Sequence, residues 1–222
     1  MNWIRAILAV TISVWLPLLE GSAAASDVAF DPGSTVRAVT EKLEREHLSR
    51  KPLDDALSKL WLGTFLESLD PQRMYFLTAD FLEFQQFEDR LDNLAKSGDF
   101  QFARLVRERY RQRTADAAAD AQKLLSMVPD FSVAEECPVA FIGYATTREE
   151  LRERWRLRLK AELLIEKLHG RQVAEVQSQL SARYQRISRQ ALDMNDQRLC
   201  EIFLNSLTVN YDRHSSYLYF TR

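Results

Sequence analysis

Residues 53–72, LDDALSKLWLGTFLESLDPQ, carry the clearest structural signal in the sequence. Apolar side chains recur along it every three or four positions, which is the spacing of one face of an α-helix. Pro52 suits the first turn of this helix, and Pro71 disfavours a helical conformation at Asp70 and so marks its end. The stripe is wide enough to predict a helix at the centre of the core, formed by Leu53, Ala56, Leu57, Leu60, Trp61, Phe65 and Leu66.

The same spacing continues on both sides of this stretch and predicts six further helices. Residues 129–146 have no clear period and are expected to form a loop, and no segment gives a convincing strand, although SSYLYF at 215–220 could extend. The helix starts are expected at the caps Ser34, Thr78, Thr147 and Asn195, with Asp99 opening the longest helix and Gly170 as a C-terminal stop. The inward side chains include Phe81, Leu82 and Phe87 of one helix that ends at AKSGD (95–99), and Leu199, Ile202, Phe203, Leu207 and Val209 of the last.

The composition supports this helical reading. The chain has 222 residues, of which 46% are hydrophobic, and this is enough for one domain with a sizeable core. Only six glycines and six prolines argue against a turn-rich β architecture. We therefore expect an all-α fold, an irregular bundle of about seven helices over residues 26–222.

The first 25 residues have the order of a secretory signal peptide. The positive Arg5 precedes an apolar run over 6–19, and small residues follow it. Because this run is shorter than the ~20 residues that a membrane-spanning helix needs, a permanent anchor is the weaker alternative. We expect cleavage near Ala25, a mature chain that is exported to the periplasm, and membrane contact only through the signal peptide before cleavage.

Export changes what the two cysteines can do, since an oxidising compartment permits disulfides. Cys137 and Cys200 are therefore a candidate disulfide pair, and the alternative is two thiols that act as small apolar side chains. The cysteines and the three histidines, His47, His169 and His214, do not have metal-ligand spacing. We predict no metal site and no cofactor.

The charged residues do not indicate a nucleic-acid partner. The 30 Lys and Arg nearly balance the 32 Asp and Glu. Two stretches, 104–113 and 148–160, are rich in arginine, and the second also contains glutamates that can pair with it along a helix. Both are expected to be solvated helix faces with local ion pairs, with an acidic partner surface as the alternative.

The stretch YDRHSSY at 211–217 contains the three residue types of a nucleophilic triad. Asp212, His214, Ser215 and Ser216 are nearly adjacent, however, and catalytic triads assemble from distant segments. A local turn, in which Asp212 and Ser215 bond nearby backbone groups, is the expected structure. We find neither a GxSxG elbow nor a glycine-rich phosphate loop and assign no catalytic residue.

Three stretches of the chain resemble the tail-specific, or carboxyl-terminal-processing, proteases. The first is HLSRKPLDDALSKLWLGTFLESLDPQRMYFLTADFLEF (47–84), which is similar to the opening of the family. The second is REELRERWRLRLKAELLIEKLHG (148–170), similar to a Trp-bearing helix that ends in Leu-x-Gly. The third is YDRHSSYLYFTR (211–222), similar to the family's DPHTxYLSPR, with Arg213 in place of the usual Pro.

In these proteases the third motif closes an N-terminal helical domain, after which come a PDZ domain and a core with a Ser and Lys catalytic pair. The resemblance therefore implies that residues 26–222 are a non-catalytic module with structural or protein-binding roles. Its expected partners are protease modules, adaptor lipoproteins or unfolded substrates. The alternatives are that the native polypeptide continues into a complete serine endopeptidase, or that the chain is an exported helical scaffold unrelated to proteolysis.

Three aromatic residues near the end of the chain are the expected protein-interaction residues. Tyr217, Tyr219 and Phe220 lie where the chain stops and would be exposed if nothing covers them. The alternative is that they pack back onto the helices.

Overall fold

The computed structural model describes residues 30–218, and the predicted signal peptide, 1–25, lies outside the described residues. Within this range the chain forms eight α-helices and no β-strand, which confirms the all-α prediction. A single isolated parallel bridge joins Leu77 to Ala145. None of the helices between residues 30 and 218 has the length and apolar character that a membrane crossing requires. The helices are α1 (Pro32–Glu46), α2 (Asp55–Leu69), α3 (Thr78–Gln85), α4 (Leu91–Ser97), α5 (Gln101–Leu125), α6 (Arg148–Leu168), α7 (Val173–Leu192) and α8 (Asp196–Tyr211).

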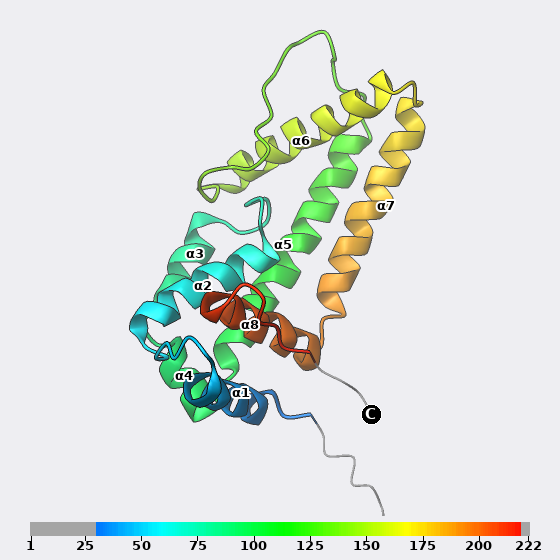
Figure 1. Cartoon of the computed structure of the whole chain (residues 1–222). Coiled ribbons are helices and arrows are strands. Elements are labelled where there is room, and N and C mark those ends of the chain that lie inside the picture. Colours follow the sequence, from blue (N-terminus) through cyan, green and yellow to red (C-terminus); the bar gives the residue numbers. More distant parts are fainter. Residues whose placement is uncertain (1–29, 219–222) are drawn as a thin grey trace, which may run out of the picture.

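The long helix α5 connects two groups of helices (Figure 1). α6 and α7 pack on its C-terminal half, and α1 to α4 together with α8 surround its N-terminal half. Each group has its own cluster of buried side chains, one centred on α2 and α8 and the other on α5, α6 and α7. The bundle is therefore elongated, with two cores that share one helix.

The predicted central helix is α2. Trp61 and Phe65 are fully buried, and the indole N–H of Trp61 donates to the carbonyl of Phe203 in α8 over 2.8 Å. The Trp61 and Phe203 rings also pack at a centroid distance of 4.3 Å. Leu60 was expected in the same stripe but is 59% exposed.

Several helix ends match their predicted signals. The side chains of Thr147 and Asn195 accept hydrogen bonds from the third residue beyond them, at 3.1 and 2.9 Å, and Gly170 ends α6 in the left-handed conformation at φ +81°. The predictions of Ser34 and Thr78 as caps are wrong. Thr78 is the first residue of α3, and its hydroxyl donates to the carbonyl of Tyr144 over 3.0 Å. Asp31 caps α1 instead, because Pro32 already occupies the first helical position and the Asp31 carboxylate accepts from two amides beyond it.

One predicted helix is in fact two. The segment from Thr78 to the AKSGD break forms α3 and α4, which are separated by a tight turn at residues 86–90. Hydrogen bonds from Phe87 N to Phe84 O and from Arg90 N to Phe87 O form this turn. The turn buries Phe84 and Leu91 together in the core. Leu82, which was expected to face inward, is 55% exposed as a consequence.

Candidate functional site

After α8 the chain turns back along that helix (Figure 1), and we call residues 212–218 the C-terminal segment. Its burial alternates, because Ser215 and Tyr217 are half-buried while the residues between and beside them are exposed. This period of two is the pattern of an extended chain that lies on a surface. Tyr217 packs against the core cluster of α2 and α8. Of the three predicted interaction residues, Tyr217 therefore packs back onto the helices, and Tyr219 and Phe220 lie outside the described residues.

The backbone of Tyr217 is held by one side chain of α8. The Tyr217 N–H donates to Asn205 Oδ1 over 2.7 Å, and the Tyr217 carbonyl accepts from Asn205 Nδ2 over 3.0 Å. A neighbouring β-strand would offer the same pair of groups to an extended chain. The Asn205 amide thus holds the segment through its backbone alone and makes no contact that depends on the identity of a side chain.

A second contact joins Ser215 to a histidine far away in sequence. His47, the C-cap of α1, places Nε2 3.1 Å from Ser215 Oγ. The backbone N–H of Ser49 donates to His47 Nδ1 over 3.1 Å. Nδ1 is therefore the unprotonated acceptor nitrogen, and the ring proton lies on Nε2. In this tautomer His47 donates to Ser215 and is unable to take its proton.

This contact is a serine and histidine pair, but it does not have the geometry of a nucleophilic site. A catalytic base would need Nε2 unprotonated and a carboxylate on Nδ1, whereas Nδ1 faces Ser49. His214 lies apart, exposed, with its backbone N–H donating to Asp212 Oδ1 over 3.2 Å. The predicted local turn is present, because Ser215 N donates to Asp212 O over 3.0 Å. The Ser215 hydroxyl, which was expected to bond a local backbone group, contacts His47 instead.

A cavity of about 680 Å³ opens beside the C-terminal segment. One wall is the segment itself, from His214 to Tyr217, and the others come from α1 and α8. The α1 and α8 side chains that line it are Val39, Lys42, Leu43, Glu46, His47 and Thr208. The volume lies within the range of about 300–1,000 Å³ that is typical of ligand pockets.

The two cysteines do not form the candidate disulfide. Cys200 is fully buried in α8, and Cys137 lies half-buried in the loop between α5 and α6. Burial raises the pKa of the Cys200 thiol to about 12. Both are free thiols, and Cys200 acts as a small apolar side chain, as the alternative interpretation proposed.

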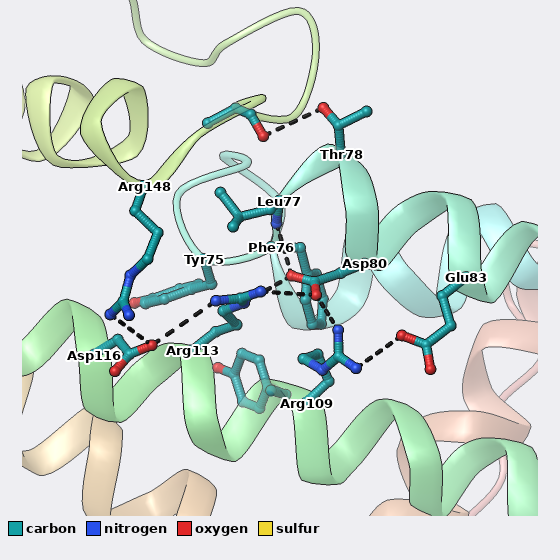
Figure 2. A network of polar contacts seen from close by, with 12 residues as sticks. Tyr75, Phe76, Leu77, Thr78, Asp80, Glu83, Arg109, Arg113, Asp116 and Arg148 are labelled. Atoms are coloured by element: carbon teal, nitrogen blue, oxygen red, sulfur yellow. Dashed lines mark hydrogen bonds and ion pairs between the residues drawn. The ribbon is translucent and has the colours of Figure 1, made fainter.

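The first arginine-rich stretch, 104–113, forms some of the expected local ion pairs, for example Arg111 with Glu108 at 2.9 Å, but it also makes long-range pairs that were not expected. Arg109 and Arg113 of α5 reach across to Asp80 of α3, as Figure 2 shows, and Arg113 donates to both Asp80 oxygens over 2.7 and 2.9 Å. Arg109 also donates to Glu83 over 2.8 Å. These arginines therefore join helices that are distant in sequence.

Asp80 is the acceptor at the centre of this network. It is fully buried, and it also accepts from the backbone N–H of Leu77 over 2.9 Å. Burial by itself would raise the pKa of Asp80, but the hydrogen bonds from Arg113, Leu77 and Arg109 outweigh it, so the pKa lies below its usual value. Asp80 is thus a charged structural group. It lies three residues after the N-cap of α3, Leu77, which is the position of the acidic residue in a capping box.

A second buried carboxylate, Asp70, organises the turn between α2 and α3. It accepts from the backbone amides of Met74, Tyr75 and Phe76 over 2.8 to 2.9 Å. Burial raises the pKa of Asp70, and the three amide donors only partly offset this effect. The sequence marked Asp70 as a helix end but gave no sign that its side chain folds the following turn.

The second arginine-rich stretch, at 148–160 in α6, fastens the loop between α5 and α6. The predicted local pairs are present, for example Arg154 with Glu150 at 2.6 Å. Other contacts are long-range, and Glu135 in the loop binds both Arg156 and Lys160. The hydrogen bonds from Arg156 and then Lys160 lower the pKa of Glu135 to about 2. Among residues 30–218 no group of His, Cys, Asp and Glu side chains is arranged to hold a metal ion.

Comparison with known proteins gives one family. Residues 39–219 match the model of the tail specific protease N-terminal domain. The chain belongs to this family. It is also similar to the tail-specific protease of Haemophilus influenzae, with 26% identity over 188 residues that cover 83% of this chain and 27% of that protein. The family resemblance inferred from the three quoted stretches is thereby confirmed.

The three stretches have distinct places in this tail-specific protease N-terminal domain. The first forms α2, the turn built around Asp70, and α3 with Asp80. The second is α6, which fastens the preceding loop. The third forms the C-terminal segment, where Arg213 is exposed and the turn is held by backbone bonds. Each motif therefore supplies a structural element of the helical domain.

Proposed function

We propose that this chain is the non-catalytic N-terminal helical domain of a periplasmic tail-specific protease and serves as a structural and protein-binding module. The observation that carries the proposal is the family match over residues 39–219. The partners that we propose are protease modules, an adaptor, or unfolded substrate protein. No nucleic acid is proposed as a partner.

The chemistry of the described residues supports a role without catalysis. The Ser49 backbone N–H holds the His47 imidazole in the tautomer that donates to Ser215. The arginines that might have bound an anionic strand are engaged within the domain, for example Arg107 with Asp196 at 2.6 Å. These contacts leave protein binding as the function that the surface supports best.

The proposal is tested by mixing the purified chain with separately expressed protease modules of a tail-specific protease. We expect a complex in a pull-down, and no cleavage of an unfolded substrate by the chain alone. Cleavage by the chain alone, or no complex with any protease module, would contradict the proposal. A variant with an unrelated exposed residue changed, Leu82→Ser, is the matched control for non-specific capture through apolar surface.

A second proposal is that the native polypeptide is a complete serine endopeptidase. It is supported by the fact that the chain spans 27% of the length of the curated relative that it matches. The intact mass of the protein purified from its source decides between the two. A mass that corresponds to residues 26–222 indicates a separate module, and a much larger mass indicates the endopeptidase. A scaffold unrelated to proteolysis receives no support from the family match.

The periplasmic location rests on residues 1–25, with Arg5 and the apolar run that follows it. Cell fractionation and N-terminal sequencing test it together. We expect the protein in the periplasmic fraction with an N-terminus near Ser26. An N-terminus at Met1 in the membrane fraction would instead indicate a retained anchor.

A further inference from the structure

We propose that α1 and α8 form a peptide-binding groove, which the chain fills with its own C-terminal segment. By its chemistry the groove takes an extended peptide that carries a hydroxyl residue two positions before an aromatic residue. This inference deepens the proposed protein-binding role by naming a ligand class and a site.

The segment is bound in the manner of an extended peptide ligand. It forms no helix and makes no pairing with a strand, yet every second residue is turned inward, as Ser215 and Tyr217 are. A bound peptide that adds to a sheet edge is held in the same way, by its backbone and by alternate side chains in pockets. Here a side chain of α8 takes the place of the sheet edge.

The groups that contact the C-terminal segment have different roles. Asn205 binds the backbone N–H and carbonyl of Tyr217, and these groups are common to all non-proline residues. His47 donates to the Ser215 hydroxyl, and the ring of Tyr217 packs on the core. Backbone contacts supply affinity for any extended chain, and the other two supply the preference for a hydroxyl residue and an aromatic residue.

Free space remains beside the C-terminal segment. The cavity of about 680 Å³ beside the segment is bounded by Val39 and Leu43 of α1 and by Thr208 of α8. The groove is therefore wider than its present occupant. Lys42 and Glu46 line it as well, so a longer peptide finds one group of each charge there.

The segment lies outside the helix and is bonded to α1 and α8 through side chains. It leaves α8 at Asp212, which ends the helix in an extended conformation with φ −157° and ψ 136°. Within residues 212–218, Ser215 and Tyr217 make the hydrogen bonds to α1 and α8 named above. A competing peptide has to replace these bonds.

The experiment uses a fluorescein-labelled peptide with the sequence of residues 212–218, DRHSSYL, and the full chain carrying Tyr217→Ala. This substitution weakens the chain's own segment and leaves the groove side chains in place. We expect the peptide to bind this variant at least about tenfold more tightly than it binds the wild-type chain, as measured by fluorescence polarisation. Circular dichroism verifies that the variant keeps its helical fold.

Three matched changes test the assignment of the contacts. Adding Asn205→Leu to the variant removes both backbone bonds and is expected to weaken peptide binding about 30-fold, which corresponds to two ordinary hydrogen bonds. A peptide with alanine at the position of Tyr217 is expected not to bind measurably. A peptide with alanine at the exposed position of Ser216 is the control and is expected to bind as the parent does.

A second measurement uses the wild-type chain and needs no variant. Excess unlabelled peptide should displace the chain's own segment and speed hydrogen exchange at the amide of Tyr217, which is bonded to Asn205 of α8 in the structure. Unchanged exchange at saturating peptide, or equal binding of peptides with and without the tyrosine, would overturn the inference. Such a failure is distinct from failure of the proposed function, because the complex with protease modules is measured separately.

Discussion

Replacing Asp80 with asparagine tests whether the arginines of α5 hold α3 against that helix. Asp80 is fully buried and accepts four hydrogen bonds, one from the backbone of Leu77 and three from Arg109 and Arg113. Asparagine keeps the shape of the side chain but removes its charge and turns one acceptor into a donor. That donor would face the guanidinium groups, so the arginines would lose their counter-ion.

The magnitude follows from the burial of the three groups. Removing one partner of a buried ion pair costs roughly 3 to 5 kcal/mol, because the other charge is left uncompensated. The two arginines are partly solvated, with 26% and 13% of their side chains exposed, which places the cost near the lower end. We expect a loss of about 3 kcal/mol in the free energy of unfolding, and for a domain of this size a fall of about 6 to 12 °C in Tm.

The assay is urea and thermal unfolding followed by circular dichroism. The matched control is Glu83→Gln, which removes the same charge from the same helix but breaks only one bond to Arg109 at a side chain that is 39% exposed. This control is expected to cost less than about 1 kcal/mol. If the two substitutions cost the same, Asp80 does not hold the helices together and the reasoning is refuted.

The effect of Asp80 should also depend on pH. Its folded-state pKa is lower than the value of about 3.9 that it has in an unfolded chain, so its stabilisation is fully present above that value and is lost as the pH falls through the folded-state pKa. The difference in stability between the wild type and Asp80→Asn should therefore narrow below about pH 4. A constant difference down to pH 2 would contradict this assignment.

Three further predictions concern the packing and the loop. Gly33→Ala should lower the free energy of unfolding in urea by more than about 2 kcal/mol, because the new Cβ would overlap the carbonyl of Gly98, the C-cap of α4. The same change at Gly143, where the space is open, is the control and should be nearly neutral. Cys137 should react with a thiol reagent in the native protein and Cys200 only after denaturation, and the intact mass should be the same with and without reductant. The carboxyl of Glu135 should titrate in carbon NMR with a midpoint of about 2. Because a depressed carboxyl pKa means that the contacts of Glu135 with Arg156 and Lys160 are lost on protonation, the loop between α5 and α6 should become sensitive to pepsin as the pH falls toward that value.

The helices could be predicted from the sequence because their signals are local. The apolar spacing identified α2, and the caps at Thr147 and Asn195 identified the starts of α6 and α8. The edges of the apolar faces were less clear, since Leu60 and Val209 fit the spacing but are exposed. A periodic pattern gives the direction of a helix face, but the neighbouring helix decides how wide the buried part becomes.

The long-range contacts could not be predicted in this way. Nothing near Arg109 or Arg113 in the sequence indicates that Asp80, about thirty positions earlier, is their partner. His47 and Ser215 are 168 positions apart and meet only because α1 and α8 pack together. Of the candidate interaction residues, only Tyr217 could be identified, from its aromatic side chain. Its partner Asn205 was missed because a single asparagine in a helix has no distinctive sequence pattern.

The positions of the arginines change how partner-binding experiments on this domain should be designed. Charge reversal along α5 is a usual way to search for an acidic partner, but Arg109 and Arg113 are bound to a buried carboxylate, so their reversal would lower stability before it altered any surface. Loss of binding in such variants would then report unfolding. Residues on α1 and α8, such as Lys42 and the exposed Val209, can be changed with little effect on the core and are the better probes. If binding to protease modules depends on the α5 arginines at temperatures where those variants remain folded, the contact surface lies on α5 and the groove between α1 and α8 serves another purpose.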